Sequence, residues 1–179
     1  VDNGFPIFRC TGNGPTLPDA CPPLPPGCEV SEDFESGQPV TGWTFAVSGN
    51  PAVFWQFDNQ PIGVQSSQLT QNPGSGNWAY YDDDAAGQNG GNNVATATSP
   101  TIDMSNYTNV EISFDYAFDA LTGGGETVIF VVEDATTAYY WTGSTWTTTA
   151  TAWLGGGIDD SENLTVPLPN GLDVSAFNV

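Results

Sequence analysis

"NVEISFDYAF", residues Asn109 to Phe118, alternates between apolar residues and smaller or polar ones and is the clearest strand signal in the chain. Successive side chains of a β-strand point to opposite faces, so residues two apart share a face. One face would carry Val110, Ile112, Phe114, Tyr116 and Phe118, and the other Glu111, Ser113, Asp115 and Ala117. This period of two predicts a β-strand over the whole stretch.

Further strand signals lie on both sides of this stretch. "ETVIFVVED" (Glu126 to Asp134) is apolar on both faces, as expected of a central strand. "AYYWTGSTWTT" (Ala138 to Thr148) predicts a hairpin that turns at Gly143-Ser144. Shorter strands are expected near Trp43–Val47, Val53–Phe57, Trp78–Tyr81, Val94–Thr98 and Leu164–Leu168.

The strands are short, rich in β-branched and aromatic residues, and separated by Gly, Asn and Pro. No segment has a convincing helical period. Strands at this spacing predict an all-β module, an antiparallel jelly-roll β-sandwich over residues 31–179.

Residues 1–30 have a different composition and predict an extended arm or linker. "CPPLPPGC" (Cys21 to Cys28) places four prolines between two cysteines, which favours semi-rigid polyproline geometry. The chain has three cysteines, Cys10, Cys21 and Cys28, and no His. A zinc site would lack its fourth ligand. We expect one disulfide plus a free or inter-domain thiol, and hence an oxidising environment.

The charge balance is extreme, with 21 acidic residues, one Arg, no Lys and a formal net charge of −20. Nucleic acid and anionic membrane surfaces attract cationic side chains, so neither is expected as a partner. The chain contains no run of eighteen apolar residues, so we expect no membrane insertion. The balance is typical of a salt-adapted or simply acidic secreted protein, and bound divalent cations would relieve its self-repulsion.

The missing residue types also limit catalysis. Without His or Lys, neither a Ser-His-Asp nor a Cys-His arrangement can form, and a Schiff-base lysine is excluded. The phosphate-binding loop needs a Lys as well. A carboxylate pair of the glycosidase kind remains, but no pair stands out. We therefore expect no catalytic residues and no enzyme activity.

"GNWAYYDDDAAGQNGGNN" (Gly76 to Asn93) contains three consecutive aspartates after an aromatic strand. Calcium takes six to eight oxygens from carboxylates, carbonyls and amides. Because side chains alternate along a strand, Asp82 and Asp84 could converge on one ion while Asp83 points away or uses its carbonyl. From the spacing alone, a solvated acidic turn is the alternative and the better supported of the two.

Two other features have simple explanations. A stacking platform for sugars is one use of exposed tryptophans, but core or edge packing is the more common use, and we expect it for most of the six. Asn106-Tyr107-Thr108 and Asn163-Leu164-Thr165 match the glycosylation sequon, which matters only in a host that uses it.

Several motifs together resemble a known family. "EDFESGQPVTGWT" (Glu32 to Thr44) carries Phe34-Glu35 followed by Gly42-Trp43, and "ATATSPTIDMSNYTNVEISFDYAF" (Ala95 to Phe118) carries "SP-x-ID-x-S" and "FDY". In this order they resemble the MAM-like and cleaved-adhesin ("choice-of-anchor" type) jelly-roll domains of secreted and surface proteins of Bacteroidetes-type bacteria. The resemblance covers about residues 32–170.

The resemblance implies structural calcium bound through the Glu of the opening Phe-Glu and acids after the Tyr-rich strand. Carried over to this chain, the ligands are Glu35, Asp82 and Asp84, with Asp83 and Asp33 behind them. Two departures exist. Asn92-Asn93 stands where the family often has acids. The chain also ends at "DVSAFNV" (Asp173 to Val179) without an evident closing strand. We therefore expect a module incomplete at its C-terminal end, or one whose last strands come from chain beyond these residues.

The resemblance and the composition imply a non-catalytic extracellular adhesion or accessory module of a larger secreted or cell-surface protein, stabilised by calcium. Its expected partners are other domains of the same long chain, and a cell-surface protein, a glycan or another copy of itself. One alternative is a structural subunit or repeat of an extracellular filament or surface layer, because the arm and unfinished sandwich would suit strand exchange. Another is a carbohydrate-binding accessory domain of a secreted hydrolase.

Overall fold

The computed structural model describes residues 34–35, 37, 42–49, 54–58, 76–81, 93–118, 125–155 and 160–179. Within these ranges the chain is all-β, with no helix. The predicted arm, its three cysteines, and the candidate ligands Asp33, Asp82, Asp83 and Asp84 lie outside the described residues.

Every strand pairing in the described part is antiparallel, as predicted. The strands are β1 (Thr44–Ser48), β2 (Gln56–Asp58), β3 (Trp78–Tyr80), β4 (Val94–Thr98), β5 (Glu111–Phe118), β6 (Thr127–Val128), β7 (Val131–Asp134), β8 (Ala138–Trp141), β9 (Trp146–Thr147), β10 (Leu154–Gly155), β11 (Asp160–Pro167) and β12 (Phe177–Asn178). They pair as β1–β4, β2–β3, β5–β11, β6–β10 and the four-stranded order β12-β7-β8-β9.

The longest pairing joins β5 to β11 over eight residues of each strand. The face of β5 that the alternation predicts as apolar is buried from Ile112 to Phe118, and it packs into the largest core. Ser113 and Ala117 on the opposite face are buried too. The prediction of a strand here is confirmed, although its second face is less solvated than the polar residues suggest.

The predicted hairpin over residues 138–148 is confirmed. β8 and β9 pair through Trp141 opposite Trp146, and the Thr142 N–H donates to the Thr145 carbonyl across the turn. Gly143 has φ 93°, a left-handed backbone that favours glycine.

The predicted single strand over residues 126–134 is wrong in one respect, because it is two strands. β6 pairs with β10, whereas β7 pairs with β8 and β12. Between them Ile129 is 54% exposed and Phe130 is buried, which breaks the regular pairing at a point where the chain changes partners.

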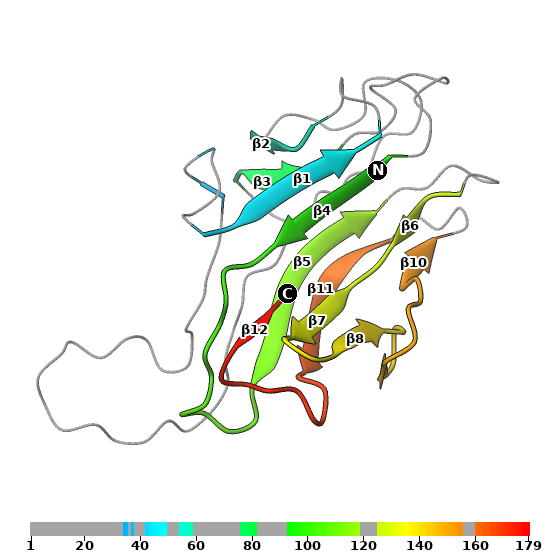
Figure 1. The fold of residues 1–179 in the computed structure, drawn as a ribbon. Coiled ribbons are helices and arrows are strands. Elements are labelled where there is room, and N and C mark those ends of the chain that lie inside the picture. Colours follow the sequence, from blue (N-terminus) through cyan, green and yellow to red (C-terminus); the bar gives the residue numbers. More distant parts are fainter. Residues whose placement is uncertain are drawn as a thin grey trace, which may run out of the picture.

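The last seven residues, which we call the closing segment (Asp173–Val179), correct the expectation that no closing strand is present. Phe177 pairs with Asp134 of β7 on one side and bridges Ile102 on the other. The Ser99 N–H donates to the Val179 carbonyl over 2.8 Å. The closing segment therefore hydrogen-bonds both to β7 and to the chain that continues from β4 (Figure 1).

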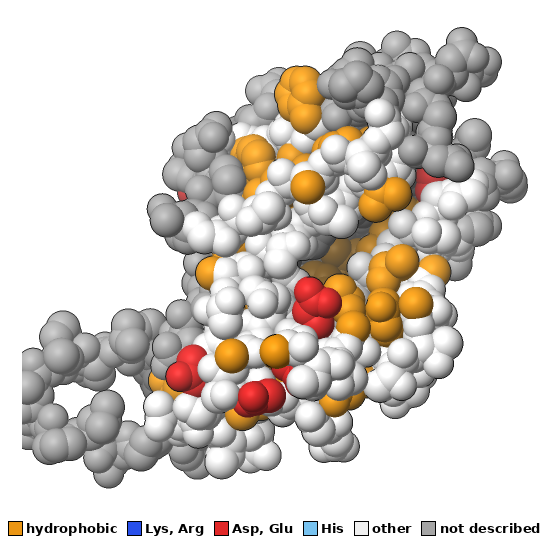
Figure 2. Space-filling model, in the orientation of Figure 1, with side chains coloured by type: hydrophobic (Ala, Val, Ile, Leu, Met, Phe, Trp, Pro, Cys, Tyr) orange, Lys and Arg blue, Asp and Glu red, His pale blue; other side chains and the backbone are white. Residues whose placement is uncertain are grey.

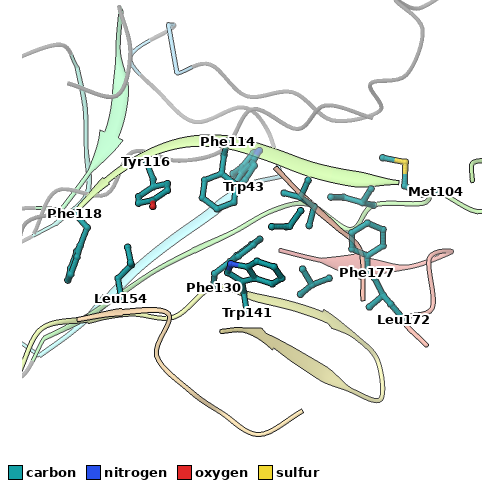
Figure 3. Packing of buried hydrophobic residues seen from close by; sticks show 14 residues of the cluster. Trp43, Met104, Phe114, Tyr116, Phe118, Phe130, Trp141, Leu154, Leu172 and Phe177 are labelled. Carbon is teal, nitrogen blue, oxygen red and sulfur yellow. The ribbon is translucent and has the colours of Figure 1, made fainter. Parts of the chain in front are cut away.

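Two hydrophobic cores lie between the strands. The main core takes side chains from β5 and β11 on one side and from β7, β8 and the closing segment on the other, as Figure 3 shows around Phe114, Phe130 and Phe177. The smaller one, called here the aromatic core, comprises Phe34, Trp55, Ala79 and Tyr81. Phe45 on β1 packs against both cores, so they adjoin each other.

Candidate functional site

Glu35 follows directly after a buried anchor. Phe34 is 2% exposed and its ring lies 5.9 Å from that of Phe57 and 6.1 Å from that of Phe45, measured between centroids. Its φ of 56° is unusual for a residue other than glycine, and the Gly37 N–H closes the turn by donating to the Phe34 carbonyl. Burying Phe34 in the aromatic core leaves Glu35 exposed at the surface beside β3.

Glu35 is tied to a residue 42 positions away. The Asn77 N–H donates to Glu35 Oε1 over 3.0 Å, and Asn77 Nδ2 donates to the Glu35 carbonyl over 3.3 Å. Neighbouring Gly76 has φ 107°, and a Cβ built there would overlap the Glu35 carboxylate. Glycine at position 76 therefore makes room for the acid that holds the start of β3.

β3 leads from this tie toward the three aspartates. It runs from Trp78 to Tyr80, and buried Tyr81 then precedes Asp82 in the chain. At a strand rise of about 3.3 Å per residue, Asn77 and Tyr81 are roughly 13 Å apart. The structure thus brings Glu35 to the start of β3, whereas the resemblance implies a place beside the loop that follows this strand. Sharing one ion with Asp82 and Asp84 requires that the chain after Tyr81 return along β3, and this ligand set stays a prediction.

In the part of the chain that the structure describes, no three His, Cys, Asp or Glu side chains form a group that could hold a metal. Of the predicted ligands, Glu35 alone lies in that part. Its carboxylate chemistry and exposure fit the hard oxygen ligands that calcium prefers.

A second carboxylate, which the sequence interpretation missed, holds the closing segment. Asp134 Oδ1 accepts the Thr136 and Thr137 N–H groups over 2.7 and 2.9 Å and the Thr136 hydroxyl over 2.7 Å. Asp134 Oδ2 accepts the Asp173 N–H over 3.0 Å. Asp173 in turn accepts Ser175 through its own Oδ1. One side chain thereby joins the β7–β8 turn to the segment that begins 39 positions later.

These hydrogen bonds favour ionised carboxyl groups. The Asp173 N–H, followed by the Thr136 hydroxyl and N–H, holds the pKa of Asp134 well below its usual range. The Ser105 N–H lowers the pKa of Asp103 in the same way. The sequence signal for Asp134 was "DATT", because Asp followed by Thr commonly bonds its own turn.

The six tryptophans pack into the molecule, as predicted. Trp43, Trp55, Trp78 and Trp141 are buried, and Trp146 and Trp153 are half-buried against the main core. The Trp146 indole N–H donates to the Pro167 carbonyl over 2.8 Å. No indole ring of this chain is exposed as a platform for a sugar.

The surface of the described part carries acidic charge without a basic counterpart. In Figure 2, Asp and Glu side chains are visible over the lower part of the face, and hydrophobic side chains line a hollow above them. The described ranges contain no Lys, Arg or His, so these acids have no basic side chain among them as a partner. Any counter-charge for them must come from Arg9, from dissolved ions or from a partner.

No helix of the described part is long and apolar enough to cross a membrane. No family model, no curated protein and no solved structure matches this chain.

Proposed function

We propose that this chain is a non-catalytic extracellular module of a larger surface or secreted protein, an antiparallel jelly-roll β-sandwich that serves adhesion or presents neighbouring domains. Calcium stabilises it at Glu35, Asp82 and Asp84. The observation that carries the proposal is the tie between the Glu35 carboxylate and Asn77, at the start of the strand that leads into the three aspartates.

Electrostatics supports an ion at this place. A formal net charge of −20 makes the compact state repel itself, and a divalent cation among carboxylates removes part of that repulsion. Because Glu35 is already hydrogen-bonded next to β3, ordering it around an ion costs less conformational entropy than ordering a mobile glutamate would.

Calcium titration of thermal unfolding tests the proposal. At low salt, calcium at about 100 times its dissociation constant should stabilise the fold by about 2.7 kcal/mol, which raises Tm by about 5–10 °C. Asp82→Asn with Asp84→Asn should abolish this shift. Glu133→Gln removes one exposed charge of β7 far along the chain and should leave it unchanged.

Magnesium serves as the ion control, since it demands a smaller octahedral site. An equal rise of Tm with magnesium, or loss of the calcium shift in Glu133→Gln as well as in the double variant, would mean general charge screening. A Tm unchanged by chelator and by calcium would refute the calcium part of the proposal.

A structural subunit of a filament or surface layer is the second candidate, and the closing segment is what favours it. This segment lies between β7 and the continuation of β4 through backbone hydrogen bonds on both sides. The same bonds could form with the closing segment of a neighbouring copy. Sedimentation velocity over a wide concentration range tests this, because exchange predicts discrete dimers and longer species, whereas an adhesion module predicts monomers.

A further inference from the structure

The two glycosylation sequons of this chain lie in contrasting surroundings. Asn106-Tyr107-Thr108 lies in the connection between β4 and β5, and Asn163-Leu164-Thr165 lies within β11. Transfer of a glycan needs access to the Asn amide nitrogen and to the hydroxyl two residues later. The structure therefore allows the two sites to be ranked.

Both reactive groups of the second sequon are already engaged across the β5–β11 pair. Asn163 Nδ2 donates to Asp115 Oδ1 over 2.8 Å, a charge-assisted hydrogen bond. The Thr165 hydroxyl lies 2.9 Å from that of Ser113. The backbone between them belongs to the longest strand pairing of the molecule. Asn163 and Thr165 are exposed, but their reactive groups become available to an enzyme only after both side-chain hydrogen bonds open.

The first sequon presents the same two groups to solvent. Asn106 and Thr108 are exposed, and neither side chain hydrogen-bonds another described residue. The Tyr107 N–H donates to the Met104 carbonyl over 2.9 Å, so Asn106 lies in a tight turn. Tyr107 itself is half-buried and packs against the main core. This anchor holds the turn at the surface while its flanking polar side chains remain accessible.

We propose that Asn106, and not Asn163, is a site of N-linked glycosylation in the folded protein. The donor is a lipid-linked oligosaccharide diphosphate. Asn106 Nδ2 forms a bond to the anomeric carbon of the sugar, and the bond from that carbon to the diphosphate oxygen breaks. The lipid diphosphate leaves with the bonding electron pair, and the amide nitrogen loses a proton to a base of the transferase.

The glycan would stand beside the closing segment. Met104, two residues before Asn106, donates its N–H to the Val174 carbonyl over 2.7 Å. A hydrophilic glycan next to this junction would hinder another strand from adding there. Its occurrence in a cell rests on the proposed extracellular location, whereas the chemical reactivity of the turn does not.

The test incubates the purified folded chain with an oligosaccharyltransferase and its lipid-linked donor, followed by peptide mass spectrometry. The rate at Asn106 should exceed that at Asn163 at least about tenfold, because two hydrogen bonds must open at the second site. Asn106→Gln should remove nearly all modification, and Asn163→Gln should change little. When the chain is kept unfolded during the reaction, the preference for Asn106 over Asn163 should disappear.

Equal rates at both sites in the folded chain would overturn the proposal. So would no transfer to Asn106 under conditions where the unfolded chain is modified at both. The reaction uses purified components and does not depend on export or on calcium. Its failure is therefore distinguishable from failure of the proposed function.

Discussion

The closing segment and the turn around Glu35 are attached to the rest of the fold in different ways. Each places a nearly inaccessible Phe in a core, Phe177 at 1% exposure and Phe34 at 2%. Each is also tied to a distant part of the chain by a carboxylate that accepts a backbone N–H. Asp134 accepts the N–H of Asp173 in the closing segment, and Glu35 accepts that of Asn77. The closing segment, however, has backbone hydrogen bonds to distant residues on both sides, whereas ring packing and hydrogen bonds with Asn77 join the Glu35 turn to distant residues.

The difference suggests where an ion matters. Asp134 fills its oxygens with four hydrogen bonds from its own turn and from Asp173. Glu35 Oε1 accepts the Asn77 N–H on an exposed side chain, and Glu35 is the calcium ligand proposed above. Stability of the closing segment should therefore be independent of calcium, and that of the Glu35 turn should depend on it.

The largest expected effect comes from Phe177→Ala. Removing a buried Phe leaves a cavity between β7 and the residues around Ile102, which should cost about 3–5 kcal/mol of unfolding free energy. Urea denaturation at fixed calcium measures it. Ile129→Ala is the matched control, because that side chain is 54% exposed, and it should cost less than about 1 kcal/mol. Similar costs for both variants would show that the closing segment is not part of the cooperative core.

The second effect compares the two carboxylates directly. Glu35→Gln keeps an oxygen for the Asn77 N–H but removes the charge, so it should lose most of the roughly 2.7 kcal/mol that saturating calcium provides. Asp134→Asn should keep the full calcium response while lowering stability with and without the ion. The measurement is the calcium-induced shift in Tm of each variant. A lost response in Asp134→Asn and a kept one in Glu35→Gln would reverse the comparison.

Gly76→Ala tests the Glu35 turn at the residue that makes room for the Glu35 carboxylate. A Cβ would displace the Glu35 carboxylate, and φ 107° strains any L side chain, so we expect a loss of about 1–2 kcal/mol and a weaker calcium response. Gly125→Ala is the control, since its Cβ would meet no atom within 4 Å. Chemical denaturation with and without calcium measures both. An unchanged calcium response in Gly76→Ala would mean that Glu35 binds no ion.

Local pattern was sufficient for much of the fold. The period of two located β5, and the strand predicted over Val94–Thr98 matches β4 residue for residue. The hairpin of β8 and β9 followed from Gly143-Ser144 between two apolar runs. In these segments, the face of each side chain and the chemistry of the turn are decided by neighbours in the sequence.

The closing segment could not be predicted in this way. "DVSAFNV" is polar at most positions and its strand has two residues, so it has too little pattern of its own. It forms because β7 and the chain after β4 offer hydrogen-bond partners on both sides. The "DATT" motif indicates the turn at Asp134. The bond from the Asp173 N–H joins residues 39 positions apart, so the local sequence does not predict it. Glu35 was found through its family-like motif, and its partner Asn77 was not.

The smallest effect concerns pH and isolates the Asp134 carboxylate. Its pKa is lowered in the folded protein, chiefly by the Asp173 N–H, so ionised Asp134 stabilises the fold. That contribution is complete above the unfolded pKa of about 3.9 and disappears as pH falls toward the lower folded value. The difference in unfolding free energy between the native chain and Asp134→Asn should therefore be constant near neutral pH and shrink below about pH 4. Taking this difference cancels the change in overall repulsion as other carboxyl groups protonate. Parallel stability curves down to strongly acid pH would show that the hydrogen bonds of Asp134 do not depend on its charge.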